Sequence, residues 1–385
     1  MTRALPFHLP PPRAGGVDLL IIAGEHSGDQ HAAAMLRAAL QQRPDLRVAA
    51  LGGPELAAAG AQLLYDLTAS SVVGLVEVLK HFWFFRMLFH ETLRWIAEHR
   101  PAAVCFVDYP GFNLRLAAEL CRRGLSVKGG GKIKALYYIS PQIWAWKPGR
   151  RFAMARHLDA LAVIFPFETL SYADTKLPVE FVGHPFLAEG YAAPVQYAAD
   201  GPILLLPGSR RQAVARIFPR MLAGFRAFGE RAAVAIYPSG DIASVLRIES
   251  RDTNLRLQAA GEPVAAAAVL TSSGTMSMHC ALAGIPGAIV YRANPLTYLL
   301  GRMLVSVPYL GIANLLLGEP MYPEFIQGAA KEKALARELA ACVHDPARRE
   351  KTAVLAARLR KVLRPGTRGT AADWLLQQFF GKGLG

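Results

Sequence analysis

The sequence of 385 residues has little of what membrane-spanning, secreted or zinc-binding proteins need. It contains no uncharged apolar run of about 18 or more residues, and prolines occupy the N-terminal stretch where a signal peptide would carry its apolar segment. Its four cysteines lack the paired spacing of a zinc site or a disulfide scaffold. We therefore expect a cytoplasmic protein with reduced core cysteines, namely Cys105, Cys121, Cys280 and Cys342.

Acidic residues are also scarce, because 29 Asp and Glu stand against 43 Lys and Arg, which gives a formal net charge of +14. A field of this sign attracts nucleic acid, anionic lipid and phosphorylated substrates alike. The sequence has no zinc finger, no basic region leading into heptads and no aromatic pair of the RNA-recognition type, so we expect no nucleic-acid partner. An anionic membrane or a phosphate-bearing substrate is expected instead.

Apolar residues are abundant, at 52% of the total, and they occur in short runs that alternate with helical stretches. Such runs predict buried parallel strands, and the alternation predicts a doubly wound α/β sheet. The pattern occurs twice, on either side of a looser stretch at residues 187–201. The predicted strands lie at 17–23, 103–108, 135–139 and 161–165, and then at 203–206, 232–237, 267–271 and 288–291.

Three parts of the chain follow from this pattern. Residues 1–186 form a first Rossmann-like domain, residues 187–355 form a second, and residues 356–385 form C-terminal helices that return to the first domain. In sheets of this kind ligands bind outside the carboxyl ends of the strands. With two such domains facing a central cleft, we expect the chemistry in the loops that follow the strands.

Two loops of the second predicted domain suit a nucleotide diphosphate. A turn after residue 271 opens a predicted helix, whose free N–H groups and hydroxyls bind phosphate; it consists of Ser273, Gly274 and Thr275. A turn after residue 206 carries Gly208, Ser209 and Arg210, and the arginine adds a fixed cation. An ordinary helix cap and a solvated surface charge are the alternatives. The occurrence of both turns at strand ends of one domain favours phosphate binding.

Aromatic residues gather in two places. The segment at residues 78–89 combines basic residues with aromatics nearly all round a predicted helix, among them Phe82, Trp83, Phe84 and Phe85. It suits contact with an anionic bilayer, and the alternatives are a homodimer interface or a core helix. Trp144 and Trp146 line a sugar or acyl pocket or fill a seam between domains. His184, between a glycine and a proline, favours a capping or hinge role over catalysis.

Taken together, the motifs resemble those of the lipid-A-disaccharide synthase family, in that family's order. The matching segments are 23–29 (AGEHSGD), 74–79, 108–114, 140–146, 166–168, 182–185, 206–210 and 273–275, continued by Asn314, Glu324 and Gln327. The match runs from about Val17 to Gln327, and the combination is specific although each piece is weak alone.

The resemblance implies a GT-B fold and an inverting glycosyltransferase at the cytoplasmic face of a Gram-negative inner membrane. The implied donor is UDP-2,3-diacylglucosamine, and the implied acceptor is 2,3-diacylglucosamine 1-phosphate (lipid X). The implied product is the β-1,6-linked lipid A disaccharide 1-phosphate, with release of UDP and without a cofactor. Because the sequence has no Asp-x-Asp pair, we expect Arg210 and the helix end at Thr275, rather than a metal ion, to stabilise the leaving UDP.

An inverting transfer also needs a base for the acceptor hydroxyl. Asp108 is the first choice, and Glu25, Asp29 and Glu77 are the other candidates. The alternative for Glu25 and Asp29 is that they hold backbone N–H groups, and the alternative for Asp108 is that it caps the following helix or braces the loop. Beside the two phosphate turns, the resemblance assigns the nucleotide-sugar side His279, Asn314, Glu324 and Gln327. To the acceptor side it assigns Ser27, Asp29, Asn113, Ser140, Trp144, Trp146 and His184.

The sequence departs from the family pattern at four positions. The usual residues there are Glu, Asp, Glu and Pro, where this chain has His279, Gly111, Ala213 and Ala313. These departures leave two alternatives, a paralogue with an altered acceptor or without catalysis, and another GT-B enzyme such as a UDP-GlcNAc epimerase.

Overall fold

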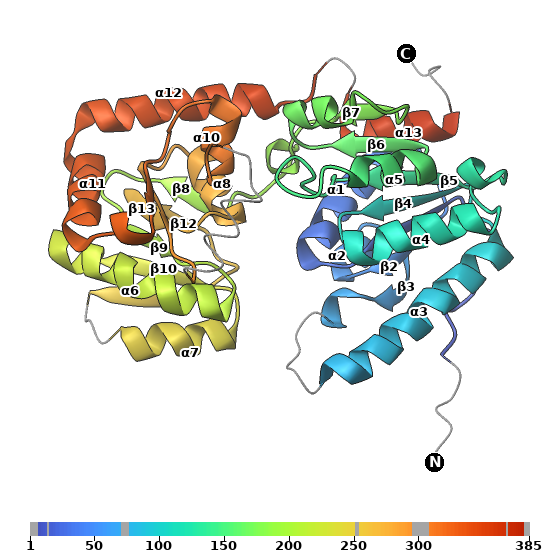
Figure 1. The fold of residues 1–385 in the computed structure, drawn as a ribbon, viewed down its shortest axis with the longest axis horizontal. Coiled ribbons are helices and arrows are strands. Elements are labelled where there is room, and N and C mark those ends of the chain that lie inside the picture. Colours follow the sequence, from blue (N-terminus) through green and yellow to red (C-terminus); the bar gives the residue numbers. More distant parts are fainter. Residues whose placement is uncertain are drawn as a thin grey trace. The chain divides into compact units, whose positions relative to one another are not determined.

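The computed structural model describes residues 7–13, 15–70, 77–250, 254–294, 308–366 and 369–380 (Figure 1). The chain divides into two compact units. The first unit comprises Met1–Ala188 with Leu363–Gly385, and the second comprises Glu189–Val362. Each unit contains its own fully parallel sheet, which confirms the predicted α/β class with two Rossmann-like sheets. Within the described part of the chain, no helix is long and apolar enough to cross a membrane.

The sheet of the first unit has the strand order β3-β2-β1-β4-β5-β6-β7. The chain order reverses between β1 and β4, which is the switch point where ligands bind in doubly wound sheets. Its strands are β1 (Leu19–Ala23), β2 (Val48–Gly52), β3 (Gln62–Asp66), β4 (Ala103–Val107), β5 (Lys134–Tyr138), β6 (Ala160–Val163) and β7 (Val179–Phe181).

Helices cover both faces of this sheet, because successive residues of each buried strand point to opposite sides (Figure 1). Leu20 and Ile22 of β1 belong to a core with α3 (Glu77–His99), α4 (Pro110–Arg122) and α5 (Arg150–His157). Leu19 and Ile21 belong to a second core with α1 (His26–Gln42), α2 (Pro54–Ala58) and α13 (Ala371–Phe380). This two-sided burial explains why β1 reads as an uninterrupted apolar run.

The second unit has a six-stranded sheet of order β11-β10-β9-β13-β14-β15 and a two-stranded sheet of β8 and β12. The strands are β8 (Val195–Tyr197), β9 (Ile203–Leu206), β10 (Ala233–Tyr237), β11 (Leu255–Ala259), β12 (Val264–Ala266), β13 (Ala268–Thr271), β14 (Gly287–Tyr291) and β15 (Glu324–Ile326). The helices in the described part of this unit are α6 (Arg211–Phe228), α7 (Gly240–Glu249), α8 (Thr275–Leu282), α10 (Ile312–Leu317), α11 (Glu332–His344) and α12 (Pro346–Leu363).

Helix α12 continues through residue 355, where the sequence predicted a domain boundary, and the chain passes to the first unit at residue 363. Beyond it, α13 packs on α1, and the Gln42 side-chain amide donates a hydrogen bond of 2.9 Å to Asp373. Trp374 of α13 lies in the same buried cluster as Leu36 of α1. The C-terminal helix therefore completes one face of the first unit.

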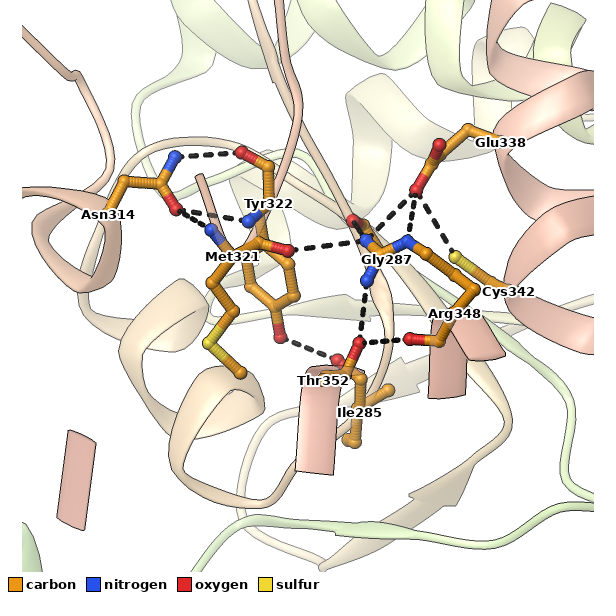
Figure 2. A network of polar contacts seen from close by, with 9 residues as sticks. All are labelled: Ile285, Gly287, Asn314, Met321, Tyr322, Glu338, Cys342, Arg348 and Thr352. Carbon is orange, nitrogen blue, oxygen red and sulfur yellow. Dashed lines mark hydrogen bonds and ion pairs between the residues drawn. The ribbon is translucent and has the colours of Figure 1, made fainter. Parts of the chain in front are cut away.

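A half-buried arginine, Arg348, joins the β14–β15 side of the second sheet to the helices α11 and α12 (Figure 2). The Arg348 guanidinium, in α12, donates to the Glu338 carboxylate of α11 at 3.0 Å and to the Thr352 hydroxyl at 2.6 Å. It also donates to the backbone carbonyls of Gly287 at 2.9 Å and Met321 at 3.3 Å. These four hydrogen bonds from one planar guanidinium join α11, α12, the start of β14 and the loop before β15.

Candidate active site

The backbone is strained where the central strands of the first sheet end. Directly after β4, Asp108 and Tyr109 have left-handed φ values of 44° and 49°, and after the neighbouring β5, Ile139 has a φ of 66°. Such conformations cost on the order of 1–3 kcal/mol for residues other than glycine, and they gather at functional sites. The strain marks this edge of the sheet as a candidate site.

Two side chains hold the strained turn in place. The Tyr137 hydroxyl donates to the Asp108 carbonyl at 2.6 Å, and the Asn113 amide donates to the same carbonyl at 2.8 Å. Asn113 is fully buried, and its amide also lies 3.3 Å from the carbonyls of Ile22 in β1 and Val107 in β4. Asn113, which sequence reasoning assigned to the acceptor, thus clamps β1 to β4 at the switch point.

The Asp108 carboxyl group shares this edge with Glu25 and Tyr109. Burial, reinforced by the nearby charge of Glu25, raises the pKa of Asp108 to about 6, although the Tyr109 backbone N–H lowers it. Glu25 is exposed and precedes α1 without capping it. The Tyr109 ring lies over Gly24, where an added Cβ would be 2.2 Å from the ring, so that only glycine fits. Glu25 and Asp108 therefore lie close enough at this edge for their charges to interact.

The other two acidic candidates for the base are Asp29 and Glu77. Asp29 is fully buried, and its carboxylate accepts N–H bonds from Gly53 at 2.7 Å, Glu55 at 3.0 Å and Leu56 at 3.3 Å. It caps α2, so the structural interpretation of Asp29 holds in this structure. Ser27 is exposed in the first turn of α1, whereas the side chains of Glu77 and Phe82 lie outside the described residues.

The loop after β5 places Ser140, Trp144 and Trp146 in three different environments. Ser140 is buried, with its hydroxyl 2.7 Å from that of Tyr172. Trp144 packs edge-on against Phe167, with ring centroids 5.2 Å apart. It also lines a hollow of about 350 Å³ together with Ile143, Pro148, Arg151, Leu170, Ser171, Ala173 and Asp174. Trp146 is 49% exposed beneath the Lys147 ammonium group, so the two tryptophans do not form a pair.

His184 caps the short helix at Pro185–Leu187, because its ring nitrogen Nδ1 accepts the Phe186 N–H at 3.2 Å. The backbone N–H of His184 donates a hydrogen bond to the Leu363 carbonyl at 2.9 Å. His184 therefore fixes the place where the C-terminal segment rejoins the first unit, which matches the capping role that the sequence favoured.

Sequence reasoning missed Glu168 as a site residue. It follows β6 in the short helix Pro166–Tyr172, and only 1% of it is exposed. Burial raises the pKa of its carboxyl group to about 8. The residue belongs to the matching segment 166–168, but a Glu three positions after a helix start is also the ordinary mark of a capping box, so the sequence alone gives it no role at the site.

In the second unit, the two predicted phosphate turns lie side by side, because β9 and β13 are adjacent strands. Gly208 has a φ of 111°, and a Cβ there would be 3.1 Å from the Ser272 hydroxyl of the other turn. Arg210 is exposed just before α6, and Thr275 is exposed at the first position of α8. Ser209 and Gly274 are exposed and Ser273 is half-buried at the same edge. A cation and a helix N-terminus therefore lie after adjacent strands at one sheet edge, which is an arrangement that suits an anion.

The remaining nucleotide-side candidates make internal contacts. His279 is buried, with its ring stacked on Tyr191 and Nε2 3.2 Å from the tyrosine hydroxyl. Gln327, with a φ of 53°, pairs with both backbone groups of Ala293 at 3.2 Å. The Glu324 carboxylate accepts from the N–H of Gly311 and from the amide of Asn314, both at 2.9 Å. The Asn314 oxygen in turn accepts the N–H groups of Met321 and Tyr322 (Figure 2). These residues shape the loops at this edge.

Solved structures with the same fold include a glycosyltransferase and an epimerase. The calicheamicin glycosyltransferase CalG4 matches with a TM-score of 0.54 at 15% identity, covering 96% of this chain and 100% of that one. The UDP-GlcNAc 2-epimerase of Neisseria meningitidis, solved with UDP-GlcNAc, matches with a TM-score of 0.58 at 9% identity, covering 94% and 98%. The two parallel sheets and the loops at their carboxyl ends therefore define a protein of the GT-B class.

Sequence comparison narrows the class further. The family model described as lipid-A-disaccharide synthetase matches residues 19–237 and 239–377. The lipid-A-disaccharide synthase of Geobacter metallireducens is 35% identical, over 94% of this chain and 97% of its own length, and that of Nitrosococcus oceani is 33% identical over 95% and 97%. The chain belongs to the lipid-A-disaccharide synthase family, and it is a glycosyltransferase.

The pKa of Asp108 generates a prediction about stability. Asp108→Asn should raise the free energy of unfolding at pH 7 by about 1–3 kcal/mol, because a desolvated carboxylate costs about 1.4 kcal/mol per unit of raised pKa. The folded-state pKa is raised from 3.8 to about 6, so this cost is absent below pH 3.8, grows up to about pH 6 and is complete above it. Urea denaturation at pH 4 and pH 7 measures the difference.

The control for this experiment is Asp45→Asn. Asp45 is exposed, and its hydrogen bond to Arg43 lowers its pKa, so its substitution should not stabilise the protein. An Asp108→Asn variant that is less stable than the wild type at pH 7 would show that the carboxylate mainly braces the turn.

Proposed function

We propose that the protein transfers 2,3-diacylglucosamine from UDP-2,3-diacylglucosamine to 2,3-diacylglucosamine 1-phosphate. The acceptor 6-hydroxyl oxygen attacks the anomeric carbon of the donor, the bond from that carbon to the UDP oxygen breaks, and UDP leaves with the electron pair. The product is a β-1,6-linked disaccharide 1-phosphate, so the configuration inverts. Family membership over nearly the whole chain supports these substrates.

Asp108 carries the proposed mechanism. A general base must be ionised at the working pH and yet basic enough to take a proton. With a pKa of about 6, the Asp108 carboxyl is ionised at neutral pH and is a stronger base than an exposed aspartate. The strained turn, clamped by Tyr137 and Asn113, fixes where the carboxylate lies. Asp108 then accepts the proton of the 6-hydroxyl as the new glycosidic bond forms.

In this proposal the second unit stabilises the leaving group. UDP departs with negative charge on its diphosphate, and the exposed Arg210 and the N-terminus of α8 at Thr275 offer positive charge at one sheet edge. Fixed donors aimed at a developing charge lower the barrier because they need no reorganisation during the reaction. These groups supply the stabilisation without a metal ion.

The reaction is tested by incubating the purified protein with UDP-2,3-diacylglucosamine and 2,3-diacylglucosamine 1-phosphate and detecting the disaccharide by mass spectrometry. Asp108→Asn should lower kcat by about 10²–10⁴-fold, the usual effect of losing a general base, while UDP affinity stays the same. A variant that keeps more than about a tenth of the wild-type turnover would remove Asp108 as the base, and Glu25 would be tested next.

The absence of disaccharide with the wild type would instead favour a paralogue with another acceptor or without catalysis.

The UDP site gives a separate prediction. Arg210→Ala should weaken UDP binding by about 1.5–3 kcal/mol, the scale of one charge-assisted hydrogen bond, as measured by isothermal titration calorimetry. Arg220→Ala is the matched control, because Arg220 is an exposed arginine further along the same helix, α6. Equal losses in both variants would mean that general charge, and not a contact of Arg210, attracts the nucleotide.

We also propose that the protein sits on the cytoplasmic face of the inner membrane through α3. Trp83 is 64% exposed and Met87 is exposed on the same helix, and the Arg86 guanidinium lies over the Trp83 ring at 5.6 Å. Phe84 and Phe85 are half-buried and pack on the core of the first unit, so they contribute less to an outer surface. An exposed tryptophan beside a cation suits the interface of an anionic bilayer.

The double variant Trp83→Ser/Met87→Ser should therefore reduce co-sedimentation with anionic vesicles about tenfold or more, since burying one large apolar side chain contributes about 1.5–3 kcal/mol. The control is Ile248→Ser, because Ile248 is 71% exposed on α7 of the second unit. If vesicle binding persists and sedimentation velocity shows that the double variant has lost a dimer, this face of α3 is a homodimer contact instead.

A further inference from the structure

Glu168 is a buried carboxyl group that the proposed mechanism does not use. Its Oε2 atom accepts the Phe165 N–H at 3.0 Å, and among the described residues no lysine or arginine forms an ion pair with it. A capping box explains the hydrogen bond between Glu168 and Phe165. It does not explain why 99% of Glu168 is buried, because capping residues usually lie on the surface.

The surroundings of Glu168 join three loops that follow adjacent strands. The Trp144 indole nitrogen, in the loop after β5, is buried without a hydrogen-bond partner among the described residues, and it lies near enough to the Glu168 carboxyl to lower the pKa that burial raises. Phe167, next to Glu168, packs edge-on against the same indole at 5.2 Å. From the loop after β4, the charge of Asp108 raises the pKa of Glu168. Glu168 thus lies where the Trp144 loop meets the Asp108 turn.

We propose that Glu168 is a positioning residue whose neutral carboxyl group holds the Trp144 loop against the turn after β6 and leaves the negative charge of this region on Asp108. The catalytic part of this inference rests on the proposed function, whereas the packing part does not. An ionised Glu168 would place a second negative charge in an apolar site near Asp108, and it would raise the pKa of that base further.

The pKa values agree with this assignment. Burial raises the pKa of Glu168 to about 8, and the pKa of Asp108 is about 6, so at neutral pH one carboxyl holds a proton and the other has lost it. Other polar groups that face this cluster are Tyr137 in β5, Tyr172 in the same short helix as Glu168, and Arg150 at the start of α5. Burial also raises the pKa of both tyrosines, so they stay neutral and bring no competing charge.

Tryptophan fluorescence tests the packing part without any substrate. In the wild type, tryptophan emission excited at a wavelength that tyrosine does not absorb should change with pH, with a midpoint near pH 8. The reason is that ionisation of Glu168 alters the electric field at Trp144. Glu168→Gln and Trp144→Phe should each abolish the transition. Glu98→Gln, at a surface carboxyl of α3, should leave it intact. A transition near pH 8 that survives in Glu168→Gln, or its absence from the wild type, would overturn the proposal.

The catalytic part is tested by the pH dependence of kcat/KM for disaccharide formation. Wild-type activity should fall as the pH rises above about 8. Glu168→Gln, which keeps the neutral shape, should stay within about threefold of the wild type at pH 7 and lose this alkaline fall. Glu168→Ala should lose about tenfold or more, mainly in kcat, with unchanged UDP affinity.

If kcat/KM of the Glu168→Gln variant falls at alkaline pH as it does in the wild type, Glu168 is only a structural helix cap. If the wild type makes no disaccharide, the proposed function fails, and the fluorescence titration still decides the role of Glu168 at the Trp144 loop.

Discussion

The first unit depends on a backbone turn that its own residues would not adopt alone. Two successive residues without the freedom of glycine, Asp108 and Tyr109, are left-handed, and hydrogen bonds from Tyr137 and Asn113 to a single carbonyl hold them there. The donors come from β5 and α4, so the neighbouring strand and the following helix must both be in place before the turn is stable. The position of the carboxylate is thus a property of the whole sheet, and Asp108 alone does not determine it.

Polar side chains at the two sheet edges divide into those that shape loops and those that face outward. Asp29, Asn113, Asn314 and Glu324 direct their polar groups to backbone partners. Glu25, Arg210 and Thr275 are exposed at the same edges. Buried polar groups need partners, so the loop-shaping residues are costly to change. Their place in the family motif is therefore compatible with a structural role as well as with binding.

The central strands were predictable because burial on both faces makes them continuous apolar runs, and all eight predicted strands are present within two residues at each end. The flanking strands were missed. β3, β7 and β15 are half-buried and carry no such run, whereas β2 (VAALG) is fully buried and apolar and was missed all the same. The site loops could be located, because they follow the predicted strands. The roles within them could not be assigned, since a carboxylate in a glycine-rich loop suits backbone capping and catalysis equally, and burial alone separates Asp29 from Glu25.

The return of the C-terminal segment to α1 has a consequence for the order in which the protein is made. The second unit is one continuous stretch, Glu189–Val362, and all of it is synthesised before α13. The first unit begins earlier, but the core that contains Leu36 stays uncovered until Trp374 arrives. Domains usually fold in the order of synthesis. Here the unit that starts first is the last to be completed, and its exposed apolar face must be protected while the ribosome makes the second unit.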